Sequence, residues 1–205
     1  MCQIFRRIPR QFFLRDVQEV APELLGTWIL RILDGEPVGG IIVEVEAYLG
    51  PEDPGSHASR PRTRANDAMW GLGGTAYVYT IHTRYCINVV TGPKEEPQAA
   101  LIRAIEPRVG LDAMRRLRGR QDPRELCSGP GKLCQALDIT LDFNYHDLTT
   151  GDVLFLARPP DEPWPLPPAQ IGVSTRIGLA QGKGENLPLR FYVRGNPFVS
   201  KPPRH

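Results

Sequence analysis

Apolar and polar side chains alternate along IIVEVEAYL, residues 41–49. A period of two is the pattern of a β-strand, because successive side chains point to opposite faces of a sheet. The pattern places Ile41, Val43, Val45 and Ala47 on one face, and Glu44, Glu46 and Tyr48 on the other. A strand of this kind packs its apolar face on a core. The carboxylate-and-tyrosine face is either a half-solvated surface or a site on a rigid element.

Further short apolar runs predict a chain with more strands than helices. We expect a helix over 16–26 with Asp16 as its N-cap, a basic helix over 109–119 and another helix over 129–139. We expect further strands over 27–33, 75–81, 85–90, 98–105, 153–157, 175–180 and 189–195. The strands over 27–33 and 41–49 are predicted to form one hairpin. The strands over 75–81 and 85–90 are predicted to be joined by a short turn at His82, Thr83 and Arg84. The absence of strand–helix alternation argues against a parallel doubly wound sheet.

The composition is that of an ordinary globular domain. Of the 205 residues, 41% are hydrophobic and 23% are charged. The sequence contains no run near the roughly 20 apolar residues that a membrane helix needs. The first residues, MCQIFRRIPRQFFLRD, lack the apolar segment of a secretion signal, and the four cysteines form no CxxC pair. We therefore expect one intracellular domain over 1–205 with reduced thiols and with frayed ends at 1–8 and 201–205.

Positive charge gathers in separate segments, although the formal net charge is only +2. Seven arginines and three acids lie between 103 and 124, and six basic residues and one acid lie between 176 and 205. Such segments are typical of a protein that turns one face to a polyanion. They are also typical of solvated helix faces and tails, which is the more common case when charge is the only evidence.

Aromatic residues suggest a place for a flat ligand. Tyr77 and Tyr79 alternate with Val78 and so share one strand face. Together with Tyr48 they could form the walls of a slot for a nucleobase, on which aromatic stacking contributes about 1–3 kcal/mol. The alternative is a cross-strand tyrosine ladder without a ligand.

Two other patterns are weaker. SGPGKL, residues 128–133, is a turn that leads into a helix, and its backbone amides with Lys132 could bind a phosphate or simply begin the helix. Asp53 and His57 could be metal ligands, but no partner stands at an established spacing.

Several longer strings carry a resemblance to a known family. They are EVEAYLGPEDPGSH, GTAYVY, CINVVTG, LIRAIEP, RELCSGPGKLCQAL and PLRFYVRGNPFVS, in that order between about residues 9 and 200. Together they resemble the alkyladenine DNA glycosylases, the mammalian type of 3-methyladenine DNA glycosylase. The resemblance implies an α+β fold: a single mixed domain with a curved, mainly antiparallel sheet, flanking helices and a protruding β-hairpin that enters the DNA minor groove.

The resemblance also assigns roles in the site. Glu46 matches the general base, Arg103 matches an arginine that helps to hold the attacking water, and the backbone carbonyl of Ile177 matches a further contact to that water. The walls of the base pocket match Tyr48 and Tyr79, which would stack on a flipped base, His57, which would contact its edge, and Asn88, which would crowd a guanine 2-amino group. Lys132, Arg62 and Arg64 are expected to contact the DNA backbone.

The hairpin departs from the family pattern. YVYTIHTRYCIN is one residue shorter than expected, and a histidine, His82, stands nearest to the position where the family has a tyrosine wedge. Tyr85 follows closely and is the alternative wedge. Histidine can stack in the gap left by a flipped nucleotide, but it displaces less apolar surface than tyrosine does.

The function implied by the resemblance is base excision repair. The enzyme would be a monofunctional N-glycosylase that acts as a monomer on double-stranded DNA and away from membranes. It would flip out alkylated or deaminated purines and release them without metal or cofactor; examples are 3-methyladenine, 7-methylguanine, ethenoadenine and hypoxanthine. It would work in the cytoplasm or nucleoid of a bacterium, or in a eukaryotic nucleus. The alternatives are a non-catalytic nucleic-acid-binding module of the same fold, and a metal-dependent hydrolase that uses Asp53 and His57.

Overall fold

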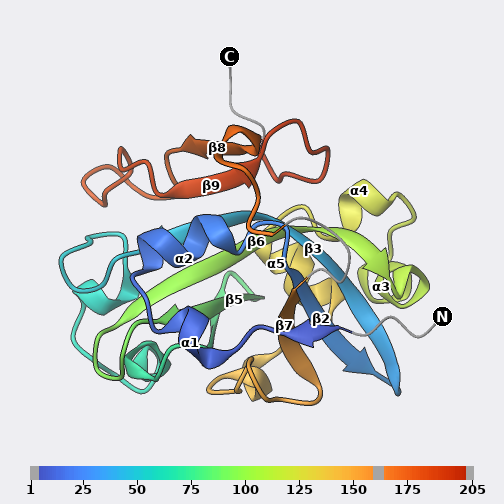
Figure 1. The fold of residues 1–205 in the computed structure, drawn as a ribbon, viewed down its shortest axis with the longest axis horizontal. Coiled ribbons are helices and arrows are strands. Elements are labelled where there is room, and N and C mark those ends of the chain that lie inside the picture. The colour runs from blue at the N-terminus through green and yellow to red at the C-terminus, as the bar shows by residue number, and fades with distance from the viewer. Residues whose placement is uncertain (1–4, 159–163, 202–205) are drawn as a thin grey trace.

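A long strand, β3 (Glu36–Tyr48), crosses the middle of the protein in this computed structural model, which describes residues 5–158 and 164–201 (Figure 1). The other strands are β1 (Arg6–Arg7), β2 (Trp28–Leu33), β4 (Ala76–Ile81), β5 (Arg84–Thr91), β6 (Gln98–Val109), β7 (Leu154–Arg158), β8 (Ile171–Ser174) and β9 (Arg190–Val193). The α-helices are α1 (Arg10–Phe13), α2 (Val17–Glu23), α3 (Leu111–Arg118), α4 (Pro123–Leu126) and α5 (Pro130–Ala136).

The strands form one nine-stranded sheet in the order β1-β7-β2-β3-β6-β5-β4, with β9 also paired to β3, and β8 to β9. The printed strand pairs are all antiparallel. β2 pairs with the first half of β3, β9 pairs with residues 44–46, and β6 follows β3 from Gly39 to Tyr48. The mixed, mainly antiparallel fold class is therefore confirmed.

β3 does not alternate regularly, because the β3–β6 register shifts on both sides of Glu44. Ile42, Val45 and Ala47 lie in the main core cluster, whereas Ile41 and Val43 lie in a second cluster with Trp28 and Tyr192. The prediction that Ile41, Val43, Val45 and Ala47 share one face was therefore wrong. Glu44 and Glu46 are both fully buried, and so the polar side of this strand is no solvated surface.

The helices cover the main core cluster, to which residues of α1, α2, α3 and α5 all contribute. α2 begins as predicted, because the Asp16 side chain accepts a hydrogen bond of 2.8 Å from the backbone N–H of Gln18. The basic helix α3 and the following α5 also match the predicted ranges. An isolated bridge between Ala104 and Ser128 holds the start of α5 next to β6.

β4 and β5 form a hairpin whose tip, residues 80–84, is exposed. The turn consists of His82 and Thr83, with φ of 45° and 65°, and Arg84 already belongs to β5. Positive φ at both central residues is the pattern of a type I′ turn, which glycine and asparagine usually occupy. A β-branched residue such as Thr83 adopts this conformation only under strain.

Two predictions need correction. Residues 175–180 are no strand: β8 ends at Ser174, after which the Arg176 side chain turns inward to Asp53 and the Ile177 N–H donates to the Glu46 side chain. Residues 6–8 of the expected frayed end belong to the fold instead, because Arg6 and Arg7 pair with β7 and Ile8 is fully buried. The predicted frayed ends at 1–4 and 202–205 lie outside the described residues.

The thiols of Cys86, Cys127 and Cys134 are buried and unpaired, while Cys2 lies outside the described residues. None of the helices in the described part of the chain has the length and apolar character required to cross a membrane.

Candidate active site

The carboxylate of Glu46 is buried between groups that hold it in one orientation. Its Oε1 accepts a hydrogen bond of 2.7 Å from the Ile177 N–H and lies 3.2 Å from Arg103 Nη1. Its Oε2 accepts a bond of 2.9 Å from the Tyr48 hydroxyl. Burial, followed by the nearby Glu46, raises the pKa of Tyr48 well above its usual value, so this hydroxyl stays a proton donor. A carboxylate has about four acceptor positions, and one of them remains for a further donor.

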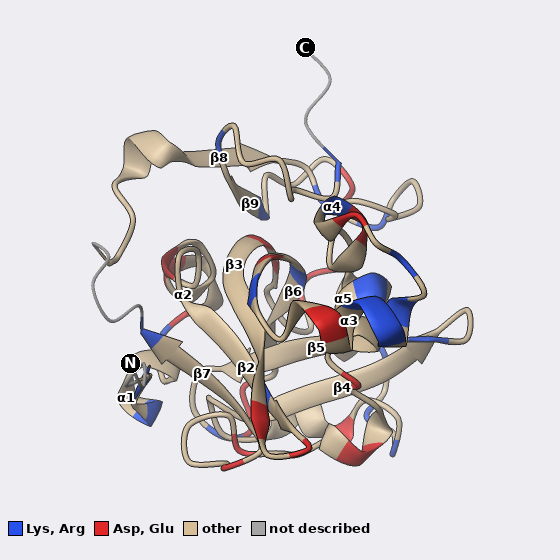
Figure 2. Cartoon of the chain, turned by 90° about the vertical axis from the view of Figure 1, so that its right-hand side faces the viewer, with Lys and Arg blue, Asp and Glu red and all other residues tan. Residues whose placement is uncertain are grey.

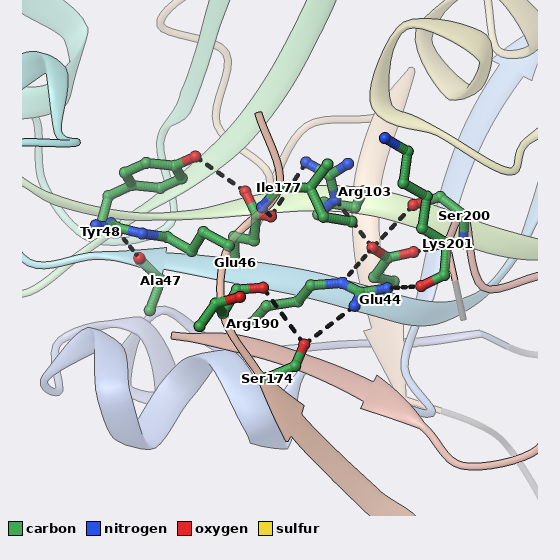
Figure 3. A network of polar contacts seen from close by, with 12 residues as sticks. Glu44, Glu46, Ala47, Tyr48, Arg103, Ser174, Ile177, Arg190, Ser200 and Lys201 are labelled. Carbon is green, nitrogen blue, oxygen red and sulfur yellow. Dashed lines mark hydrogen bonds and ion pairs between the residues drawn. The ribbon is translucent and has the colours of Figure 1, made fainter. Parts of the chain in front are cut away.

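Arg103 joins Glu46 to a second buried carboxylate, Glu44 (Figure 3). Glu44 Oε1 accepts from Arg103 Nε at 2.9 Å and from Arg190 Nε at 2.8 Å. Ser200 donates to the same carboxylate through its backbone N–H at 2.6 Å and its hydroxyl at 2.9 Å. Burial alone would raise the pKa of Glu44, but Arg103, Arg190 and Ser200 outweigh it and hold that pKa below its usual range. Two carboxylates and two guanidinium groups therefore form one charge-balanced cluster.

A cavity of about 310 Å³ lies beside this cluster. Three of its lining residues, Tyr48, Arg103 and Ile177, are the ones that hold Glu46. The rest of the lining includes His57, Met69, Tyr77, Tyr79, Ile81, Cys86, Asn88, Leu101, Pro130 and Leu179. The cavity has the size of a small-molecule site and is mostly apolar with a few polar groups.

Aromatic rings form one wall of the cavity. The centroids of the Tyr77 and Tyr79 rings lie 5.5 Å apart, and the His57 ring stands edge-on to Tyr79 at 4.6 Å. His57 Nδ1 lies 2.7 Å from the Tyr77 hydroxyl. Burial, and then the nearby Arg60, lower the pKa of His57 below 6.5, so the ring is neutral at pH 7. The structure therefore brings the predicted pocket residues together, with Tyr48, Tyr79 and Asn88 on strands of the sheet and His57 on a short 3-10 helix in the loop after β3.

Asn88 also lines this cavity and is almost fully buried. Its side-chain amide donates a hydrogen bond of 2.9 Å to the backbone carbonyl of Tyr77, across the β4–β5 pair. This bond fixes the orientation of the amide group next to any ligand in the cavity.

The hairpin tip lies beside a basic surface. Lys and Arg positions are concentrated in the ribbon on and around α3, next to the β4–β5 hairpin (Figure 2). Arg84 of the hairpin and Arg118 of α3 both donate to the Gln135 side chain of α5, at 2.6 Å and 2.5 Å. His82 is exposed at the tip, whereas Tyr85 is partly buried and packs against the core. The wedge alternatives therefore differ in accessibility.

The three predicted DNA-backbone residues are not equivalent. Arg62 donates to Asp67 and to Glu95, each at 2.6 Å, and its guanidinium stacks on Trp70. Arg64 is exposed and lines a neighbouring groove that shares His57, Tyr77 and Tyr79 with the cavity. Lys132 is exposed on α5, with its Nζ 3.5 Å from the Ser128 hydroxyl, close to Pro130 at the cavity edge.

Asp53 and His57 do not come together as metal ligands. Both oxygens of Asp53 accept hydrogen bonds from Arg176, at 2.5 Å and 2.7 Å, and His57 is bonded to Tyr77. Within residues 5–158 and 164–201, no group of three or more His, Cys, Asp or Glu side chains could hold a metal ion.

Sequence reasoning missed three features of the site. The first is the pairing of Glu44 with Arg103 and Arg190. The second is the position of the Arg176 guanidinium against the Tyr48 ring. The third is Ile81, an exposed apolar residue in the cavity lining. A signal existed for Glu44, because a second carboxylate two residues before Glu46 on a buried strand requires a cationic partner. The tyrosine pattern had already indicated Tyr77.

Comparison with known proteins gives a consistent result. The model of a family described as Methylpurine-DNA glycosylase (MPG) matches residues 11–197. A protein of Carboxydothermus hydrogenoformans named "Putative 3-methyladenine DNA glycosylase" is 47% identical over 195 residues, which cover 95% of this chain and 98% of that protein. A protein with the same name in Methanoculleus marisnigri is 45% identical, and the alignment covers 95% of this chain and 98% of that protein. Another in Bacillus licheniformis is 38% identical, and the alignment covers 95% of this chain and 96% of that protein.

The Glu44 cluster yields a stability prediction. Glu44→Gln leaves two buried arginines short of a negative charge, so we expect the free energy of unfolding at pH 7 to fall by about 3 kcal/mol. Because the pKa of Glu44 is lowered in the folded state from 4.5, its contribution is present above pH 4.5 and is lost as the pH falls below that value. Urea titrations at several pH values should therefore show a difference between variant and wild type that shrinks below pH 4.5.

The matched control is Asp112→Asn, which breaks an ion pair whose carboxylate is 93% exposed. This change should cost less than about 1 kcal/mol. Equal stability of wild type and Glu44→Gln across the pH range would show that the buried cluster does not stabilise the fold.

Proposed function

Since the chain belongs to the methylpurine-DNA glycosylase family, it is a DNA glycosylase and a hydrolase of glycosidic bonds, and we propose that it releases alkylated and deaminated purines from double-stranded DNA through a water activated by Glu46. The observation that carries this proposal is a carboxylate oriented by Ile177, Arg103 and Tyr48 at the edge of an aromatic-walled cavity. We also propose that the chain acts as one catalytic domain, because segments from β3 to the loop after β8 contribute to this cavity.

Base flipping provides the substrate for this chemistry. The glycosidic bond of a stacked base is inaccessible, so the nucleotide must leave the duplex at a cost of a few kcal/mol, which is smaller for a damaged base. The flipped purine stacks between Tyr48 and Tyr79, and His57 contacts its edge. The neutral His57 ring suits this role because it adds no charge to the pocket. Asn88, fixed by Tyr77, crowds a 2-amino group and so disfavours guanine.

The bond is broken by hydrolysis. Glu46 accepts a proton from water while the water oxygen attacks C1′, and the electron pair of the glycosidic bond leaves with the purine. The ionised carboxylate also stabilises the positive charge that develops on the sugar. Arg103 and the backbone of Ile177 orient the carboxylate and the water. The family resemblance implied the Ile177 carbonyl as a contact to the water, and the contact of this residue to Glu46 uses its N–H.

We propose that the β4–β5 hairpin enters the DNA with His82 as the wedge. His82 stands at the exposed tip, in a strained type I′ turn, whereas Tyr85 packs against the core. The neighbouring surface of α3, with Arg84 and Arg118 close to each other across Gln135, matches the negative charge of the flanking phosphates.

Glu46→Gln is the first test. We expect the single-turnover release of hypoxanthine or 1,N6-ethenoadenine from a duplex to fall by about 10²–10⁴-fold. The dissociation constant of the lesion duplex should change little, because the carboxamide keeps the shape of the site. Base release is measured as strand cleavage at the resulting abasic site after treatment with alkali. The control is Glu52→Gln, which changes an exposed acid of the following loop.

Retained activity in Glu46→Gln would remove Glu46 from its role. A wild-type protein that binds the lesion duplex and releases no base would support the alternative of a non-catalytic binding module.

Arg64→Ala and Arg62→Ala should differ in their effect on DNA binding. Arg64 faces a groove next to the cavity, and its loss should reduce the slope of log affinity against log salt concentration by about 1. Arg62 already pairs with Asp67 and Glu95, so its loss should change the slope much less. Fluorescence titrations at several salt concentrations measure both slopes. Equal slopes would mean that these ion pairs break when DNA binds.

His82→Ala should lower excision by about tenfold, because the gap in the duplex is left unfilled and the base returns to the stack. Fluorescence of 2-aminopurine next to the lesion reports the flipping step directly. Thr80→Ala, on the exposed part of the same hairpin, is the control. A His82→Ala variant that flips and excises like wild type would exclude His82 as the wedge.

A further inference from the structure

The ring of Tyr48 lies between a buried cation and the cavity. The Cζ atom of Arg176 lies 4.7 Å from the centroid of this ring. Tyr48 lines the cavity, whereas Arg176 does not. One face of the ring is therefore covered by a guanidinium group, and a base in the cavity has only the other face to stack on.

Arg176 is held in this place by the surrounding backbone and by Asp53. The side chains of both residues have no exposed surface, and the carboxylate accepts two bonds from the guanidinium. Arg176 Nη1 also donates to the Ala47 carbonyl at 3.1 Å, and Asp53 accepts from the N–H groups of Leu49 and Gly55. Within the described residues, Arg176 Nε is buried without a hydrogen-bond partner. The positive charge is thus permanent and fixed in position.

A buried ion pair of this kind stabilises a fold no better than a well-packed apolar pair does. The position behind an aromatic wall of the base pocket gives it another consequence. The negative face of an aromatic ring attracts cations, and a cation already bound on one face weakens the attraction for a second cation on the other face. A neutral base on the cavity face loses no such attraction.

We propose that Arg176 and Asp53 set the charge preference of the base pocket through Tyr48. The inference rests on the proposed function, and it makes Arg176 a specificity-determining residue that does not touch the base. Arg176 weakens the stacking of cationic methylpurines and so reduces their advantage over neutral purine lesions. Asp53, on the far edge of the guanidinium, offsets part of this effect.

The two residues allow a graded change of charge behind the ring. Asp53→Asn leaves the guanidinium without its carboxylate. The double variant Asp53→Asn/Arg176→Gln removes both charges and keeps two hydrogen-bonding side chains of similar shape. Arg176→Lys keeps the charge and loses the planar fork. Arg15→Gln/Glu23→Gln is the control, because it removes another two-bond pair whose residues lie outside the cavity lining.

The readout is the affinity for two bases of the same shape and different charge. One duplex carries 7-methylguanine, which is cationic, and the other carries 7-deaza-7-methylguanine, in which carbon replaces the charged nitrogen. Each affinity is measured relative to an undamaged guanine duplex, in a Glu46→Gln background so that no base is released. The preference is the ratio of the affinity for the cationic base to that for the neutral base.

The proposal predicts opposite shifts of this ratio. Relative to the parent, we expect a fall of about tenfold in Asp53→Asn and a rise of about threefold in the double variant. Arg176→Lys and the Arg15→Gln/Glu23→Gln control should stay within about twofold of the parent. Because the two informative variants shift the ratio in opposite directions, a general loss of folding cannot imitate the result, and each folded variant tests the proposal on its own.

An unchanged ratio in variants that still prefer damaged DNA would overturn the inference and leave the proposed function intact. If no protein of the series distinguishes either lesion from guanine, and the wild type releases no damaged base, the proposed function fails and the inference fails with it.

Discussion

The site depends on one shared cation. Arg103 binds Glu44 through Nε and lies next to Glu46 through Nη1, so the two buried carboxylates of β3 are held by a guanidinium from the neighbouring strand. Arg190 of β9 supplies the second positive charge, and Ser200 supplies two further donors. Without these cations the burial of two carboxylates two residues apart would cost several kcal/mol per ion. The cluster therefore connects β6, β9 and the segment after β9 to the position of the candidate base.

The irregular register of β3 and β6 makes this arrangement possible. In a regular strand Val43 and Val45 would face the same core, yet they belong to different clusters because the pairing shifts on both sides of Glu44. Glu44 pairs with Tyr192 of β9 and accepts a hydrogen bond from the side chain of Arg190, which is the cross-strand partner of Glu46. The Glu46 carboxylate remains beside Tyr48 and the cavity. The local register shift thus accompanies different roles of the two glutamates: Glu44 is structural, and Glu46 has a proposed catalytic role.

Sequence patterns predicted most of the sheet, the cap at Asp16 and the shared face of Tyr77 and Tyr79, because these depend on neighbours along the chain. The resemblance to a family selected Glu46, Arg103 and Ile177, which the structure brings together. The failures have a common cause, which is contact between residues far apart in the sequence. Arg176 and Asp53 are separated by 123 residues, and Glu44 and Ser200 by 156. Local propensity favoured a strand over 175–180, and contacts with distant side chains prevented it.

The carboxylate that we propose as the base faces a conflict, because in this role it must keep its charge to activate water and yet must not repel phosphates. The structure resolves this conflict by balance inside the protein. The charges of Glu44 and Glu46 are matched by those of Arg103 and Arg190, and the charge of Asp53 by that of Arg176. The site therefore presents little net charge to the duplex, and the basic surface around α3 and the hairpin can attract it. A formal net charge of only +2 is thus compatible with DNA binding, because neighbouring arginines balance the negative charges of the acids in the site.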